Sequence, residues 1–367
     1  MASSGYAWPL SVAPMMKVTD RWWRVFGRCL SRETLFYSEM LVDNAVLFSG
    51  KELASTEGNL ALQLGGNDPR TLGEATSWLL ERFPGCVEVN LNCGCPSAVV
   101  ASKNCFGARL MLEPELVRQI VAEMSRRSSN VPVTVKHRLG TDLGGADYED
   151  TASFVRAAAS GGARHFVVHT RMAILGTRLS CDQNRSIPPL VPKVAHDLRK
   201  DFPELTFSIN GGLKNLESCE NHLKQGMHSA MVGRAAWYTP FELLGTADTR
   251  IFQKKTNPAN TRRRVITQYA DHLDDYFDTQ DDDALQDDDL PIFRPLYYAF
   301  TGLRNAKKFR IALVSAAQQR QRAVFKRNKG HVAFSDDSSL DPPSAVIADA
   351  MRDAGISDDL LDIPFLT

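Results

Sequence analysis

Residues 87–97 read VEVNLNCGCPS, an apolar run that stops abruptly in a loop. The first half alternates and is rich in Val, Leu and Asn, as expected of a short buried strand. Gly94 and Pro96 then end the strand, because glycine permits an unusual turn and proline lacks a backbone N–H. We therefore predict that Cys95 lies in the loop beyond the carboxyl end of a strand, where folds with parallel sheets place their reactive groups.

Seven similar apolar runs occur before and after this one. They occupy residues 10–15, 35–40, 60–64, 131–136, 165–169, 205–209 and 230–232. Segments with helical periodicity separate most of them, at residues 69–83, 114–127, 148–159, 192–202 and 215–225. Strand alternating with helix eight times over about 240 residues is typical of a (β/α)8 TIM barrel, which we predict for residues 1–246. A doubly wound open sheet is the alternative, but it seldom needs eight regular units.

Polar or reactive side chains follow the carboxyl end of each predicted strand. At the first six ends they are Pro14-Met15-Met16, Glu39, Gln63, Asn92 with Cys95, Lys136, and His169 with Arg171. The strand ends of a barrel open on one face, so we expect these groups to converge there. The last two ends supply small residues and a guanidinium that suit a phosphate group. They are Asn210-Gly211-Gly212 and Gly233-Arg234.

The character of the chain changes after residue 246. Residues 247–330 lack strand-like alternation and are predicted to form a smaller, all-helical domain, interrupted by an acidic loop at 278–290. Between residues 290 and 335 there are ten Lys or Arg and no Asp or Glu, a distribution that favours contact with nucleic acid. Residues 331–367 are acidic and are predicted to be a flexible tail.

Composition limits the class of protein. The chain has 367 residues, and its formal net charge is zero, so any basic surface must come from uneven distribution. Seven cysteines without a CxxC pair argue against a disulfide scaffold or a metal site and fit a reducing compartment. No apolar run is long enough to span a membrane. We expect a soluble, cytoplasmic monomer without metal or membrane contact, or an organellar one if a transit segment has been removed.

In combination, the motifs closely resemble those of the A-type tRNA-dihydrouridine synthases. They run from residue 11 to 313 and read SVAPMMKVTD, FYSEM, LALQLGGNDP, NLNCGCPS, VKHRLGTD, VVHTR, NRSIPPL, SINGG and MVGRA. The resemblance implies an FMN-binding barrel followed by a helical tRNA-binding domain. It also implies reduction of a D-loop uridine, at position 20 or 20a of tRNA, to 5,6-dihydrouridine, with NADPH or NADH as the reductant.

The resemblance also implies roles for individual residues. Cys95 would be the general acid that protonates C5 of uracil after the flavin hydride has reached C6, and Asn92 would lie between flavin and uracil. FMN would be held by Pro14, Met15, Met16, Gln63, Lys136, His169, Asn210, Gly211, Gly212, Gly233 and Arg234. The tRNA would be contacted by Arg171, by Arg185 and by Arg178, which stands in for a lysine common in the family.

Each of these residues also has a plainer interpretation. Cys95 could be an ordinary half-buried thiol, and Cys93 is the rival candidate for the acid. Lys136 could be a basic strand end, and His169 a satisfied core histidine. The whole protein could be a flavin oxidoreductase acting on a small molecule, against which the basic helical domain argues. It could also be a non-catalytic tRNA-binding relative, although such a protein would not need to keep Cys95, Lys136 and His169.

Overall fold

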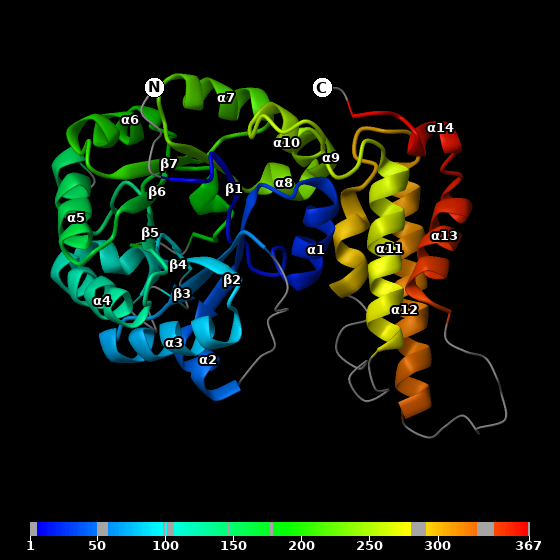
Figure 1. Cartoon of the computed structure of the whole chain (residues 1–367), viewed down its shortest axis with the longest axis horizontal. Helices are drawn as coiled ribbons and strands as arrows, with labels where there is room; N and C mark the ends of the chain where they lie inside the picture. Colours follow the sequence, from blue (N-terminus) through cyan, green and yellow to red (C-terminus); the bar gives the residue numbers. More distant parts are fainter. Residues whose placement is uncertain are drawn as a thin grey trace. The chain divides into compact units, whose positions relative to one another are not determined.

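The structure, a computed structural model, describes residues 6–49, 58–97, 100, 106–144, 147–176, 179–279, 291–328 and 341–365. The chain divides into two compact units (Figure 1). The first contains Met1–Thr19 and Glu33–Gly233, and the second contains Asp20–Arg32 and Arg234–Thr367. These limits differ from the predicted division into residues 1–246, 247–330 and 331–367.

The first unit is a closed barrel of eight parallel strands, which confirms the predicted (β/α)8 fold. The strands are β1 (Leu10–Val12), β2 (Leu35–Val42), β3 (Leu60–Gly65), β4 (Cys86–Cys93), β5 (Val133–His137), β6 (His165–His169), β7 (Thr206–Asn210) and β8 (Ser229–Val232). Neighbours in sequence pair with one another, and β8 pairs with β1 to close the barrel. Each observed strand overlaps one of the eight apolar runs, because those runs have the length and apolar character of buried parallel strands.

Helices alternate with these strands, and their starts follow local capping signals. They are α2 (Asp43–Ser49), α3 (Pro69–Arg82), α4 (Pro114–Arg127), α5 (Tyr148–Ser160), α6 (Pro192–Asp201) and α7 (Leu216–Lys224), with short 3-10 helices η2 (Gly107–Leu112) and η3 (Gln183–Arg185). The Asp68 carboxylate accepts a hydrogen bond from the N–H of Thr71 at 2.8 Å, as an N-cap does. Asn215 and Ser218 form a reciprocal capping box at the start of α7.

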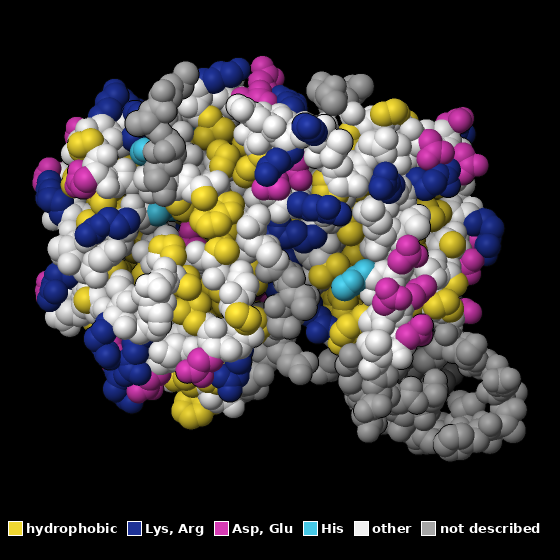
Figure 2. All heavy atoms as spheres, in the orientation of Figure 1, with side chains coloured by type: hydrophobic (Ala, Val, Ile, Leu, Met, Phe, Trp, Pro, Cys, Tyr) yellow, Lys and Arg dark blue, Asp and Glu magenta, His cyan; other side chains and the backbone are white. Residues whose placement is uncertain are grey.

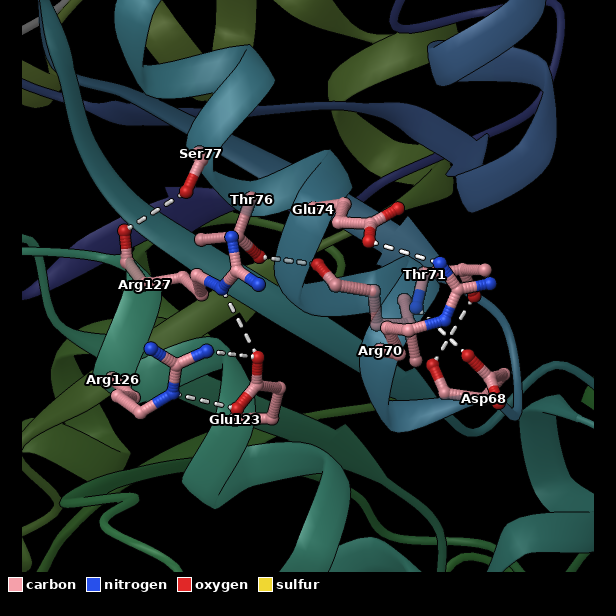
Figure 3. Close-up of polar contacts among 10 residues, drawn as sticks. Asp68, Arg70, Thr71, Glu74, Thr76, Ser77, Glu123, Arg126 and Arg127 are labelled. Atoms are coloured by element: carbon pink, nitrogen blue, oxygen red, sulfur yellow. Dashed lines mark hydrogen bonds and ion pairs between the residues drawn. The ribbon is translucent and has the colours of Figure 1, made fainter.

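Helices α3 and α4 approach each other closely on the outside of the barrel (Figure 3). A Cβ atom at Gly73 would lie 2.7 Å from Cγ of Glu123, so a side chain at this position would require the Glu123 side chain to move. Glu123 accepts hydrogen bonds from Arg126 and Arg127 of its own helix. A groove of about 550 Å³ runs along this face, and its Arg70 and Arg118 are paired with glutamates of their own helices. We therefore interpret the charges of this groove as helix-surface pairs.

A buried polar network fills part of the barrel interior. The Glu88 carboxylate accepts hydrogen bonds from Tyr6 at 2.9 Å, from Thr134 at 2.7 Å and from Tyr37. Burial raises the pKa of Glu88, while the three hydrogen bonds oppose that rise. The Tyr6 ring also stacks on His165, with ring centroids 3.5 Å apart. These bonds satisfy polar groups that have no access to water, as a buried network must.

The second unit is helical, and its first helix comes from between β1 and β2. Its elements are α1 (Arg21–Leu30), α8 (Arg234–Tyr238), α9 (Pro240–Leu244), α10 (Ala247–Arg250), α11 (Arg262–Asp278), η5 (Pro291–Tyr298), α12 (Ala306–Asn328), α13 (Pro343–Ala354) and α14 (Asp358–Leu361). The Phe26 ring of α1 packs edge-on against Phe241 and Tyr269, at centroid distances of 5.8 and 5.6 Å. The Ser31 hydroxyl and the Arg32 N–H both donate to Asp248. Helix α1 therefore belongs to the helical unit although it lies within the barrel segment of the sequence.

The C-terminal residues differ from the predicted flexible tail. Residues Pro343–Ala354 form α13, which buries Val346 and Ile347 and contacts α11 and α12. Two of the acidic side chains that suggested a solvated tail, Asp358 and Asp362, bind the Arg263 guanidinium at 2.6 and 2.7 Å. The expectation is therefore wrong for α13 and α14, because a short apolar face was hidden by the acidic composition of the segment.

We expect Ile347→Ala to lower the free energy of unfolding by about 2–5 kcal/mol, the usual cost of removing a large buried side chain. Ile347 is 1% exposed, whereas Ile311 on α12 is 59% exposed and serves as the matched control. Ile311→Ala should change stability by no more than about 0.5 kcal/mol. Urea unfolding followed by circular dichroism measures both variants, and equal midpoints would show that α13 does not stabilise the unit.

Candidate active site

Strand register brings the predicted strand-end residues to the same end of the barrel. Asn92 pairs with Lys136 across β4 and β5, and His169 pairs with Asn210 across β6 and β7. Side chains of paired residues point to the same side of a sheet. The Asn92 amide donates to Gln63 Oε1 at 2.7 Å, and Lys136 Nζ donates to Asn210 Oδ1 at 3.0 Å. The structure therefore brings these five residues together at the barrel mouth.

The loop that carries Cys95 is held by hydrogen bonds to its backbone. Asn92 Oδ1 accepts from the N–H groups of Gly94 and Cys95, at 3.1 and 2.9 Å. The Cys95 carbonyl accepts from Ala108 N at 2.9 Å, which ties the loop to η2. A Cβ atom at Gly107, where φ is +66°, would lie 2.6 Å from that carbonyl oxygen. The backbone at Cys95 is thus fixed on both sides.

The structure separates Cys95 from its rival thiol. Cys93 is the last residue of β4 and is fully buried, and its side chain points to the opposite face from that of Asn92. It pairs with His137, which is also fully buried. Cys95 is partly exposed and follows the strand. Of the two thiols, Cys95 is therefore the one at the barrel mouth.

A second cysteine lies against Cys95, and sequence reasoning did not single it out. The Cys95 and Cys181 thiols are hydrogen-bonded to each other. This contact and burial raise the pKa of Cys95, whereas the same contact, with Arg185 and Arg138 nearby, lowers the pKa of Cys181. No spacing pattern in the sequence links two cysteines so far apart.

Arg138 is a further residue of this region without a predicted role, although it lies in the VKHRLGTD motif. It is 2% exposed, and its guanidinium donates hydrogen bonds to three backbone carbonyls. Nε donates to Gly94 O at 2.9 Å, and Nη1 donates to Met172 O at 3.0 Å and to Asn184 O at 3.1 Å. Burial lowers the pKa of Arg138 to about 10, so it remains a cation at neutral pH. Arg138 thus joins the loop after β4 to the loop after β6.

Lys136 and His169 both have altered protonation equilibria. Desolvation, followed by repulsion from Arg138, lowers the pKa of Lys136 to about 7. Desolvation also lowers the pKa of His169, and the cations of Arg138 and Lys136 act in the same direction. The His169 imidazole is therefore neutral at pH 7. Together they offer a titrating ammonium and a neutral ring to any ligand in the barrel mouth.

Glycines shape the other side of the barrel mouth. Gly211 and Gly212 have φ values of +111° and +75°, which side chains rarely adopt. A Cβ atom would lie 2.9 Å from His169 Cδ2 at the first of these positions and 2.5 Å from a Leu190 methyl group at the second. At Gly233 it would come within 3.9 Å of the Met15 sulfur. These contacts bring the end of β7 close to that of β6 and the end of β8 close to that of β1, and the phosphate site stays a prediction.

The remaining predicted residues at this site have diverse environments. Pro14 and Met15 are half-buried, Met16 is 59% exposed, and Arg234 is an exposed residue at the start of α8. Thr19 Oγ1 accepts a hydrogen bond from Met15 N at 3.0 Å.

The predicted tRNA-contacting arginines stabilise the loop after β6. Arg171 donates to the carbonyls of Ser186 and Pro188, and Arg185 forms an ion pair with Asp182. Arg178 lies outside the described residues. Contact of these arginines with tRNA stays a prediction.

Two negative findings apply to the described part of the chain. There, no group of three or more His, Cys, Asp or Glu side chains is arranged to hold a metal ion. No helix in the same described ranges has the length and apolar character needed to cross a membrane.

Comparisons with known proteins agree on one family. The model of the family "Dihydrouridine synthase (Dus)" matches residues 11–333. The chain is 43% identical over 271 residues to the tRNA-dihydrouridine(20/20a) synthase of Synechocystis sp., covering 73% of this chain and 78% of that protein. It is 44% identical over 260 residues to the protein of that name from Pseudomonas aeruginosa, covering 70% and 76%. It is 42% identical over 269 residues to that of Vibrio vulnificus, covering 72% and 80%. The chain therefore belongs to the dihydrouridine synthase family.

Proposed function

We propose that this protein reduces a D-loop uridine of tRNA, at position 20 or 20a, to 5,6-dihydrouridine, using FMN and NADPH or NADH. The observation that carries the proposal is the arrangement at the barrel mouth, where the Cys95 thiol lies on a loop anchored by Asn92. Lys136 and Asn210 are hydrogen-bonded beside it. Membership of the family and the names of the relatives support the choice of substrate.

The residues present fit FMN. Gln63, Lys136 and Asn210 offer amide and ammonium groups of the kind that bind the carbonyls and ring nitrogens of a flavin. Gly211 and Gly212, which have positive φ values, and Gly233 follow the seventh and eighth strands, where barrels commonly bind a phosphate, and the exposed Arg234 would neutralise it. When bound and reduced, FMN supplies the hydride for C6 of uracil.

Cys95 supplies the proton that completes the reduction. Protonation of C5 requires an acid that still carries its proton at neutral pH, and the hydrogen bond with Cys181, together with burial, raises the pKa of the Cys95 thiol. After transfer the sulfur is a thiolate, which takes up a proton from solvent before the next cycle. Asn92 positions the thiol through the backbone N–H of Cys95, and Arg138 fixes the same loop at Gly94.

The tRNA would be bound by both units, and the target base must leave its stack to enter the barrel mouth. Among residues 291–322 of the second unit, the exposed basic side chains that would contact phosphate are Arg304, Lys307, Lys308 and Arg322. Two other arginines of the predicted basic segment are engaged in the fold, since Arg294 pairs with Asp20 at 3.7 Å and Arg320 donates to the Asp341 carbonyl.

Acidic side chains in the second unit restrict where tRNA can bind. They gather over the C-terminal half of α11 in Figure 2. We expect tRNA to avoid that surface. We also expect the protein to be a monomer and to act in the cytoplasm.

The test is dihydrouridine formation in tRNA that lacks the modification. FMN-loaded protein and NADPH should form dihydrouridine in unmodified tRNA of wild-type sequence. Unmodified tRNA with cytidine at positions 20 and 20a should give none. Flavin-loaded protein that leaves tRNA unchanged but oxidises NADPH with an enone would instead be a small-molecule oxidoreductase. Binding of tRNA without any NADPH oxidation would identify a non-catalytic relative.

A further inference from the structure

Two thiols from different strand-end loops meet beside the barrel mouth. Cys95 follows β4 and Cys181 lies between β6 and α6, and their sulfurs are hydrogen-bonded. Both side chains are partly exposed, so a small oxidant can reach them. The other cysteines described in the barrel unit, Cys86, Cys93 and Cys219, are buried. The Cys95–Cys181 pair thus differs from these three cysteines, because its two thiols contact each other and are partly exposed to solvent.

The fold holds the two loops in this arrangement. The buried Arg138 guanidinium donates to the carbonyl of Gly94, the residue before Cys95, and to the carbonyl of Asn184. Asn184 N in turn donates to Ser180 O at 3.0 Å, which closes the turn that contains Cys181. The fully buried Asn184 side chain also bonds both backbone groups of Ile174. The backbone next to each cysteine is therefore tied to one arginine.

Charges around the pair favour a reactive thiolate at Cys181. The Arg138 and Arg185 guanidiniums both act on Cys181, and Asp182 opposes them. A thiolate is the form that attacks peroxides and disulfides, and cations nearby increase its population. Hydrogen-bonded sulfurs must still approach each other to reach the disulfide length of about 2.0 Å. Movement of the half-exposed Cys181 turn would supply that approach.

We propose that Cys95 and Cys181 are a redox modification site, in which hydrogen peroxide converts the two thiols into a reversible disulfide that stops catalysis. The Cys181 thiolate attacks one peroxide oxygen, which breaks the O–O bond and leaves a sulfenic acid and, after protonation, water. The Cys95 sulfur then attacks the Cys181 sulfur and displaces hydroxide, which takes the Cys95 proton to form a second water. In sum, two thiols are oxidised by two electrons, one peroxide is reduced to two waters, and a dithiol reductant reverses the change.

Formation of the disulfide does not depend on the proposed function, whereas its effect on catalysis rests on the role proposed for Cys95. In the disulfide form Cys95 carries no proton to donate to C5 of uracil, and the disulfide would occupy space beside the base. Disulfides in reducing compartments are usually transient and regulatory, which fits a pair that is reduced at rest.

The test uses full-length, FMN-loaded protein treated with hydrogen peroxide, blocked with a maleimide and digested without reductant. Mass spectrometry should find a cross-linked peptide containing Cys95 and Cys181. Dihydrouridine formation should be lost and then recovered after dithiothreitol. Cys181→Ser, whose hydroxyl still accepts a hydrogen bond, should form dihydrouridine but give no cross-link and no recovery by dithiothreitol. Cys29→Ser, which removes a partly exposed cysteine elsewhere, should behave as wild type.

The outcomes separate the two proposals. Free maleimide-labelled Cys95 and Cys181 after oxidation, or Cys95 linked to a different cysteine, would overturn the redox site. A Cys95–Cys181 cross-link that leaves dihydrouridine formation intact would overturn its effect on catalysis. A cross-link in protein that forms no dihydrouridine before oxidation would support the redox pair and count against the proposed function.

Discussion

Replacement of Cys95 by alanine is expected to lower the rate of dihydrouridine formation about 10²- to 10⁴-fold, the range that a positioned general acid contributes. The FMN content of the purified variant should not change, because Cys95 is not among the residues proposed to hold the flavin. The measurement is dihydrouridine per tRNA against time, at saturating NADPH, with flavin absorbance recorded for each preparation.

Cys93→Ala is the matched control for this prediction, because it removes a thiol two residues away. Cys93 is fully buried on the outward face of β4, so its loss should reduce stability without reducing the rate. A Cys93→Ala variant that loses activity while Cys95→Ala keeps it would reverse the assignment of the acid. If both variants remain fully active, neither thiol donates the proton.

Replacement of Lys136 by methionine should separate activity from stability. We expect the rate to fall about 10²- to 10³-fold, the cost of removing one donor that stabilises developing negative charge. At pH 7 the variant without flavin should nevertheless be more stable than wild type, because Lys136 is desolvated and its pKa is lowered to about 7. A methionine side chain has a similar length but is uncharged, so its burial carries no cost of desolvating a charge.

The stability difference should depend on pH in a defined direction. Between about pH 7 and the ordinary lysine pKa near 10.4, the unfolded wild type binds a proton that the folded protein does not hold, so its stability rises with pH. Lys136→Met has no such group, and its advantage should shrink between pH 7 and pH 9. Thermal unfolding at pH 7, 8 and 9 measures this, and a variant that is less stable by the same amount at every pH would show that the ammonium is structural.

The same shift predicts how flavin binding depends on pH. If the Lys136 ammonium donates to bound FMN, binding favours its protonated form, and affinity should weaken as pH rises above about 7, by up to about tenfold per pH unit. Fluorescence titration of the apoprotein with FMN tests this, and Lys136→Met should lack the dependence. An affinity that is independent of pH in wild type would mean that Lys136 does not contact the flavin in its charged form.

Much of the barrel was predictable because its signals are local. A run such as residues 165–169 has the length and composition of a buried parallel strand, and the structure has β6 at these residues. Proline and capping residues mark the start of α3 in the same way. Helices α1 and α13 were missed for different reasons. The partners of α1 lie more than two hundred residues away in the chain, and the apolar face of α13 is short and surrounded by acidic residues.

The sequence by itself determined the order of eight strands, the polar residues at their carboxyl ends and the family motifs, since periodicity and strand termination depend on neighbours along the chain. Only the tertiary structure decided that Cys95 and not Cys93 faces the barrel mouth, since Cys93 ends β4 with its side chain buried, whereas Cys95 lies in the loop beyond the strand and is partly exposed. It also showed that Arg138 joins two loops and that Cys181 lies against Cys95. These contacts join residues that are distant in sequence, and only closure of the barrel brings them together.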